Sequence, residues 1–171
     1  MKKFDLRVVA FAVLLLFSMS CRKSAGGPYN MTITLNGTPV TLYDATCISG
    51  PVVGSPGVNA FRMTAATYDS SKALTIDIRL SGNMKAGTYA SDGPDAVVEV
   101  NYYENLSKPG FKTFTMADVS GKPVCKYTVN IIEVAGNIIR GNFTGNYLTN
   151  VSAGNATSEV TQGDFYALRV Y

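Results

Sequence analysis

The stretch Leu74-Thr75-Ile76-Asp77-Ile78-Arg79-Leu80 alternates strictly between aliphatic and polar side chains. Successive side chains of a β-strand point to opposite faces of a sheet, so this pattern predicts a strand with one buried and one solvated face. The leucines and isoleucines should point into a core, whereas Thr75, Asp77 and Arg79 should point to water. This stretch is the clearest half-buried strand in the chain.

Shorter stretches on both sides of this strand repeat the alternation and are separated by turn residues. Apolar residues at every second position are Phe61, Met63 and Ala65 before it, and Val98, Val100 and Tyr102 after it. Asn36-Gly37, a strong hairpin signal, joins the alternating stretch 31–35 to residues 40–42. Glycine and proline clusters predict a surface loop at residues 49–59.

The last third of the chain predicts a long hairpin and a closing strand. Residues 125–134 are rich in β-branched side chains, Gly136-Asn137 marks a turn, and residues 138–148 return. Glycines lie beside aromatic residues on one face of the returning strand, namely Gly141, Phe143, Gly145 and Tyr147. This neighbourhood indicates close packing rather than catalysis. Residues 160–171 are expected to form the closing strand.

The whole pattern is typical of a single all-β domain. It has roughly ten short strands, turn signals about every 8 to 15 residues and no helical periodicity after the first twenty or so residues. We expect an antiparallel β-sandwich. A flattened, lipocalin-like β-barrel is the alternative, because strand order rather than alternation distinguishes the two.

The amino terminus has the anatomy of an export signal. Lys2, Lys3 and Arg7 lead into an apolar run at residues 8–17, which is shorter than the ~20 residues that span a bilayer. Ser18-Met19-Ser20 directly before Cys21 resembles the lipobox of bacterial lipoproteins, in which the cysteine receives a diacylglyceryl group and becomes the new amino terminus. An ordinary signal-peptidase site at the same place is the alternative.

These features divide the chain into a lipoprotein signal peptide (1–20), a lipidated cysteine with a flexible tether (21–29) and one β domain (30–171). The signal carries three of the 15 basic residues and one of the 12 acidic residues, so the remainder is nearly neutral. A nearly neutral domain gives no support to nucleic acid as a partner. We expect the lipid on Cys21 to hold the protein at the membrane.

The cysteines and the lack of histidine bear on chemistry. Besides Cys21 the chain has Cys47 and Cys125, and disulfides persist outside the cytoplasm. Both lie in stretches that read as strands, so we expect a disulfide between them, with two separately buried thiols as the alternative. With no histidine and with scattered carboxylates, the sequence predicts no catalytic site, no metal site and no cofactor.

Glycine and aromatic landmarks recur along the domain. They are the Asn36-Gly37 turn, the strand 74–80 followed by Gly87-Thr88-Tyr89, the motif Arg140-Gly141-Asn142-Phe143 and the closing Thr161-Gln162-Gly163-Asp164-Phe165. Together they resemble a group of small, uncharacterised lipoproteins of Bacteroidota. The resemblance covers nearly the whole domain and implies the β fold and an outer-membrane location, on either the periplasmic or the cell-surface face. It implies no catalytic residues.

Three functions fit these observations. The first is a noncatalytic binding or interaction module that presents loops or an aromatic face to a glycan, a peptide or an envelope protein. Candidate exposed stacking residues are Tyr43, Tyr68, Tyr103 and Tyr147. The second is a structural or accessory subunit of an envelope assembly, and the third is a small apolar-ligand carrier. A filled core with an exposed aromatic face favours the first, an unpaired edge strand the second, and a tyrosine-lined cavity the third.

Overall fold

The computed structural model describes residues 27–94, 96–106, 109–117, 125–150 and 156–170, which form an all-β domain. These residues include no helix long and apolar enough to cross a membrane. The predicted signal peptide and the lipidation site Cys21 lie outside the described residues.

The strands follow the predicted alternating stretches. In chain order they are β1 (Asn30–Leu35), β2 (Thr38–Pro51), β3 (Val58–Ala66), β4 (Lys72–Ser81), β5 (Gly87–Ala90), β6 (Ala96–Glu104), β7 (Lys112–Phe114), β8 (Thr128–Ala135), β9 (Ile138–Thr144), β10 (Leu148–Asn150), β11 (Ala156–Ser158) and β12 (Val160–Val170).

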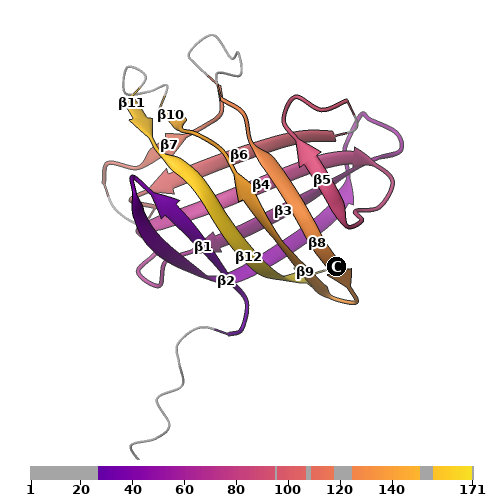
Figure 1. The fold of residues 1–171 in the computed structure, drawn as a ribbon, viewed down its shortest axis with the longest axis horizontal. Helices are drawn as coiled ribbons and strands as arrows, with labels where there is room; N and C mark the ends of the chain where they lie inside the picture. Colours follow the sequence, from indigo (N-terminus) through magenta and orange to yellow (C-terminus); the bar gives the residue numbers. More distant parts are fainter. Residues whose placement is uncertain (1–26, 95, 107–108, 118–124, 151–155, 171) are drawn as a thin grey trace, which may run out of the picture.

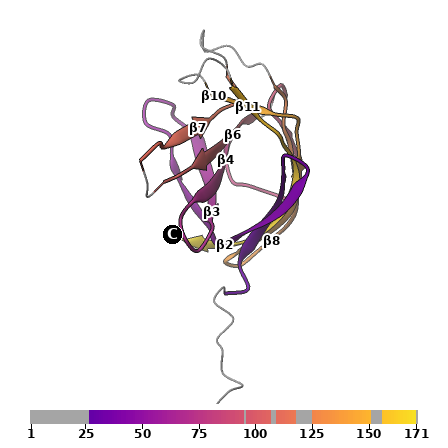
Figure 2. The ribbon, with the colours of Figure 1, turned by 90° about the vertical axis from the view of Figure 1, so that its left-hand side faces the viewer.

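Ten strands form one large sheet in the order β5-β8-β9-β12-β1-β2-β3-β4-β6-β7, antiparallel except for an additional parallel pairing of β12 with β2, and β10 pairs with β11 in a small second sheet. The large sheet folds over into two facing layers, with β3, β4 and β6 in one layer opposite β8 and its neighbours in the other (Figures 1 and 2). Among the described residues no pairing joins β5 to β7, so the sheet is not closed into a barrel. The predicted antiparallel, sandwich-like fold is confirmed, and the barrel alternative is wrong.

Strand β2 connects the two layers. Its first half pairs with β1, and its second half pairs with β3. The register between β2 and β3 shifts between Tyr43 and Thr46, and Asp44 has a positive φ of 53°. A β-bulge of this kind bends a strand and increases its twist. The bulge therefore lies where β2 passes from one layer to the other.

The predicted first hairpin is confirmed, but the expected loop at residues 49–59 is shorter. Asn36 and Gly37 both have positive φ values, 48° and 77°, as a tight two-residue hairpin turn requires. Strand β2 continues through Pro51 and β3 begins at Val58, because residues 49–51 pair with residues 59–61.

Strand β4 confirms the alternation of residues 74–80 on its inner face and corrects the expectation for its outer face. Leu74, Ile76 and Ile78 are fully buried in the core. Thr75 and Asp77 point outward as predicted, yet they are buried as well. Asp77 accepts two hydrogen bonds from the Arg62 guanidinium of β3, at 2.8 and 3.0 Å. Neighbouring strands thus cover a face that the sequence assigned to water.

The hairpin formed by β8 and β9 is shorter than expected at both ends. Strand β8 begins at Thr128 rather than at residue 125, and β9 ends at Thr144. The close packing predicted for its glycines is confirmed. Phe143 lies in register with Gly163, and Phe165 lies in register with Gly141. A Cβ atom at Gly141 would lie 2.6 Å from Cζ of Phe165, and one at Gly163 would lie 2.6 Å from Cε1 of Phe143.

Side chains fill the space between the layers. The largest fully buried ones are Tyr102, Tyr127, Phe61, Phe143 and Phe165. The Tyr127 hydroxyl donates a hydrogen bond to the Val160 carbonyl at 2.7 Å, so this buried tyrosine has a polar partner. The buried side chains of the two layers form one hydrophobic core.

Candidate functional site

One row of outward-facing residues crosses nine strands in direct register. From β8 to β7 its members are Glu133, Arg140, Tyr166, Asn30, Tyr43, Ala66, Ala73, Tyr103 and Thr113. Residues opposite each other on neighbouring strands lie side by side on one face. The row therefore places Tyr166, Tyr43 and Tyr103 along one line across the outer face of the sheet.

Each tyrosine of the row stacks on a second aromatic ring. Tyr29 stacks on Tyr166 with ring centroids 5.4 Å apart, Tyr68 on Tyr43 at 3.9 Å, and Phe111 on Tyr103 at 6.1 Å. The interplanar angles are 20°, 16° and 11°, so all three pairs are close to parallel. Tyr68 and Phe111 are the open members of their pairs, with 52% and 54% of their surfaces exposed.

The structure places two of the four predicted tyrosines, Tyr43 and Tyr103, in this row and stacks a third, Tyr68, on Tyr43. Tyr43 and Tyr68 form one pair, and Tyr103 lies in the same row three strands away, across Ala66 and Ala73. Tyr147 lies apart, in the partly buried connection between β9 and β10. Tyr147 is therefore not part of the aromatic row.

A hollow of about 280 Å³ lies beside the Tyr43–Tyr68 pair. Its lining includes Tyr43, Asp44, Thr46, Thr64, Thr67 and Tyr68. These residues offer two ring faces, several hydroxyl groups and one carboxylate. We call this hollow the tyrosine hollow.

Local backbone geometry holds Tyr68 over Tyr43. Tyr68 lies in the turn between β3 and β4, where Ser70 has a positive φ of 51°. The Asp69 carboxylate accepts hydrogen bonds from the Thr67 hydroxyl at 2.7 Å and from the Ser71 N–H at 3.0 Å. Such side-chain-to-backbone bonds fix a turn. The ring is thus presented by an ordered turn.

The tyrosine hollow carries one phenol whose acidity is altered. The pKa of Tyr68 is raised, first by partial removal from water and then by its neighbours Tyr43 and Asp44. A phenol whose pKa lies above the ordinary value of 10.0 is protonated at neutral pH. Tyr68 therefore offers an O–H donor beside its open ring face.

Two ion pairs lie on the outer face of β3, β4 and β6, beyond the tyrosine hollow. Arg62 binds Asp77 through two nitrogen–oxygen contacts, and Arg79 binds Glu99 at 2.9 Å. The Asp77 carboxylate raises the pKa of Arg62, so this guanidinium stays charged. With these charges balanced, the outer face of β3, β4 and β6 does not favour a strongly charged ligand.

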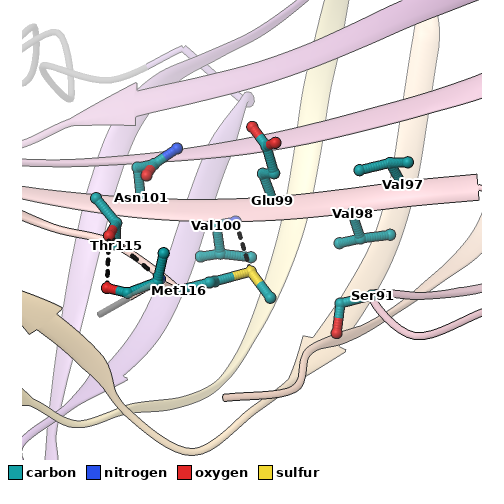
Figure 3. A pocket seen from close by; sticks show the side chains of 9 residues that line it. Ser91, Val97, Val98, Glu99, Val100, Asn101, Thr115 and Met116 are labelled. Atoms are coloured by element: carbon teal, nitrogen blue, oxygen red, sulfur yellow. Dashed lines mark hydrogen bonds between the residues drawn. The ribbon is translucent and has the colours of Figure 1, made fainter. Parts of the chain in front are cut away.

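A second hollow, of about 330 Å³, follows the edge of β6. Strand β7 pairs only with residues 102–104 of β6, and no described strand pairs with the rest of that edge. Val98 and Val100 point to one side of β6, whereas Glu99 and Asn101 point to the other (Figure 3). The Val100 N–H donates to the Met116 sulfur at 3.1 Å, a weak acceptor in place of a backbone carbonyl. The sequence carried no signal for this edge, because strand order is not encoded locally.

The predicted disulfide is wrong, because Cys47 and Cys125 are both buried free thiols. Cys47 lies in β2 between Met63 of β3 and Arg169 of β12. Cys125 precedes β8 and donates its S–H to the Met116 carbonyl at 3.4 Å. Burial raises the pKa of each thiol to about 11. The two residues are core side chains, which was the alternative for this pair.

Comparison with known proteins does not assign the chain to a group. The described residues contain no cluster of three or more histidine, cysteine, aspartate or glutamate side chains that could hold a metal ion. No family model, curated protein or solved structure matches the chain.

Proposed function

We propose that the protein is a noncatalytic binding module of the cell envelope, held at the outer membrane by a lipid on Cys21, and that the tyrosine hollow binds a glycan. One observation carries the ligand proposal: the stacked Tyr43 and Tyr68 rings stand beside a hollow lined by hydroxyl groups. The filled core favours this function over that of an apolar-ligand carrier.

The chemistry of the tyrosine hollow suits a neutral sugar. One face of a pyranose ring exposes C–H groups that pack on an aromatic ring, while its hydroxyls need hydrogen-bond partners. Tyr68 offers an open ring face, and Thr46, Thr64 and Asp44 offer oxygen atoms nearby. Tyrosine combines an apolar face with a polar tip, which suits such a mixed surface.

The cellular address rests on the sequence. The basic start, the short apolar run and the small residues before Cys21 support export followed by lipidation. Acyl chains contribute ~0.8 kcal/mol for each buried CH₂ group, and stable anchoring needs more than one chain. A diacylglyceryl group meets that requirement.

Glycan binding can be tested with a matched pair of aromatic variants. The mature protein is screened against an array of bacterial and plant glycans, and the best ligand is titrated by calorimetry. Tyr68→Ala should weaken binding at least tenfold, which corresponds to about 1.4 kcal/mol. Phe111→Ala is the control, because Phe111 is an equally exposed stacking ring outside the tyrosine hollow. Equal losses in both variants, or no glycan bound at all, would refute the proposal.

A second candidate is an accessory role in an envelope assembly, favoured by the β6 edge. Between Ala96 and Asn101 the outer edge of β6 has no strand partner among the described residues. Free strand edges pair readily with another chain. A photocrosslinker at Val97, next to this edge, should capture a defined envelope protein in cells, whereas one at the fully exposed Val53 should not. No specific product from position 97 counts against this role.

A further inference from the structure

An apolar strip lies on the outer surface where the chain enters the fold. Beyond the start of β1, strands β12 and β2 pair directly in parallel, with Leu168 opposite Thr46 and Val170 opposite Ile48. Ile48 and Val170 are exposed, at 60% and 42%. The Tyr29–Tyr166 pair borders the strip. We call Ile48, Leu168, Val170 and this tyrosine pair the entry strip.

The entry strip differs from the neighbouring outer surface. Across β3, β4 and β6 the corresponding outward positions hold Arg62, Asp77 and Glu99, which are charged. The entry strip holds aliphatic and aromatic side chains instead. Contiguous exposed apolar side chains, unlike singly scattered ones, are candidates for a protein or membrane contact.

The start of the domain is fixed against the same place. The Tyr29 carbonyl accepts a hydrogen bond from the Ala45 N–H of β2 at 3.3 Å, so the chain enters the sheet beside β2. Figure 1 shows β1 starting next to β2 and β12 at the lower end of the domain. Tyr29 therefore enters the sheet beside the entry strip.

The short tether limits what the entry strip can reach. From Cys21 to Tyr29 there are roughly eight residues, which span at most about 28 Å when fully extended. As a flexible coil the same length averages about 16 Å. A domain of this size has a radius of gyration of about 14 Å, so the lipid anchor stays within about one domain diameter of the entry strip.

We propose that the entry strip rests on the lipid surface that holds the anchor, so that the domain lies on the membrane on its β2–β12 side. This inference depends on the lipid anchor of the proposed function. Tyrosine rings and aliphatic side chains are the groups that settle at the boundary between headgroups and acyl chains. The tether keeps these groups at a high local concentration near that boundary.

The test measures how deeply single positions sit in a bilayer. The mature lipidated protein is placed in vesicles of phosphatidylethanolamine and phosphatidylglycerol, with a nitroxide on a Val170→Cys variant. Cys47 and Cys125 are buried, so the new surface thiol can be labelled selectively. Val97→Cys is the matched control, because Val97 is an outward-facing valine with 51% exposure on β6.

We expect vesicle binding to reduce access of a water-soluble nickel complex to the Val170 label at least threefold and to increase access of oxygen. The Val97 label should not change. Introducing Ile48→Asp into the labelled Val170→Cys variant should restore access of the nickel complex to the label, while the protein still floats with the vesicles.

Three results would overturn the inference, and they differ in what they say about the anchor. A Val170 label as open to nickel as the Val97 label, in protein that floats with vesicles, refutes the membrane contact and leaves the anchor intact. Failure to float refutes both. Shielding of Val170 that persists without lipid, in the Cys21→Ala protein, shows that the tether or a second copy covers the entry strip instead.

Discussion

Replacing Gly145 by alanine tests how tightly the core is built around Tyr127. The new Cβ atom would lie only 2.5 Å from Cζ of the Tyr127 ring, which is almost completely buried. Non-bonded carbon atoms pack at about 3.5 to 4.0 Å, so the ring must move by about 1 Å or more. The Tyr127 hydroxyl donates to the Val160 carbonyl at 2.7 Å, and a shift of this size breaks that hydrogen bond.

The expected loss of stability has two parts. Overpacking of a core costs about 1 to 3 kcal/mol, and a buried polar group left without a partner costs about 1 to 3 kcal/mol. Gly145→Ala should therefore lower the free energy of unfolding by about 2 to 6 kcal/mol, a large share of a typical total of about 5 to 15 kcal/mol. Urea unfolding followed by circular dichroism measures the change through the midpoint.

Two further variants isolate the cause. Gly50→Ala is the matched control, because a Cβ atom there meets no atom within 4 Å; it should be neutral or stabilising by up to about 1 kcal/mol. In a Tyr127→Leu background the Gly145→Ala change should cost less, because the smaller side chain leaves room for the methyl group. An equal cost in both backgrounds, or a cost no larger than that of Gly50→Ala, refutes the reasoning.

Three other predictions concern titration, the ion pair and the anchor. Burial raises the pKa of the Cys47 and Cys125 thiols from 9.0 to about 11, so the thiolate form favours the unfolded chain. The urea midpoint should therefore be constant below about pH 8 and fall between about pH 9 and 11. A flat profile contradicts this. Asp77→Asn should cost about 1 to 3 kcal/mol in urea unfolding at pH 7, because the buried carboxylate accepts two bonds from Arg62, and an unchanged midpoint would show that the pair is not stabilising. Cys21→Ala should leave the domain folded and move the protein to the aqueous phase in detergent partitioning; retention in the detergent phase contradicts the lipobox prediction.

Local alternation predicted the inner faces of the strands and failed on one outer face. The inward residues of β4 were correct because the side-chain period of a strand is fixed by backbone geometry. Thr75 and Asp77 were expected in water but are buried. Their cover comes from other strands, as the Arg62 bond to Asp77 illustrates, and a local pattern carries no information about such neighbours.

The cysteines show the same limit. An even number of thiols in an oxidising compartment is compatible with a disulfide, but pairing depends on where the two segments lie in the fold. Cys125 was expected in a strand, yet β8 begins only at Thr128. Cys47 lies next to Met63 and Arg169, and the Cys125 thiol donates a hydrogen bond to the Met116 carbonyl. Counting residues could not distinguish this arrangement from a bridge.

The candidate site was predicted in part. Composition and alternation singled out Tyr43, Tyr68 and Tyr103, but the row that joins Tyr43 to Tyr103 depends on the register of four neighbouring strands. Tyr166 was missed because its partner Tyr29 lies at the other end of the domain sequence. The alternation of residues 160–171 indicates that Tyr166 points outward, but it does not identify the ring on which Tyr166 stacks.

The bulge at Asp44 decides which face of β2 each side chain reaches. Leu42 points inward and Tyr43 outward, and strict alternation would then turn Thr46 and Ile48 inward and Cys47 outward. The extra residue resets the alternation, so that Cys47 is buried and Ile48 is exposed. Because of this reset, Thr46 points outward into the tyrosine hollow and Ile48 points outward into the entry strip. The two surfaces proposed for ligand and membrane are therefore adjacent because one backbone irregularity produces both.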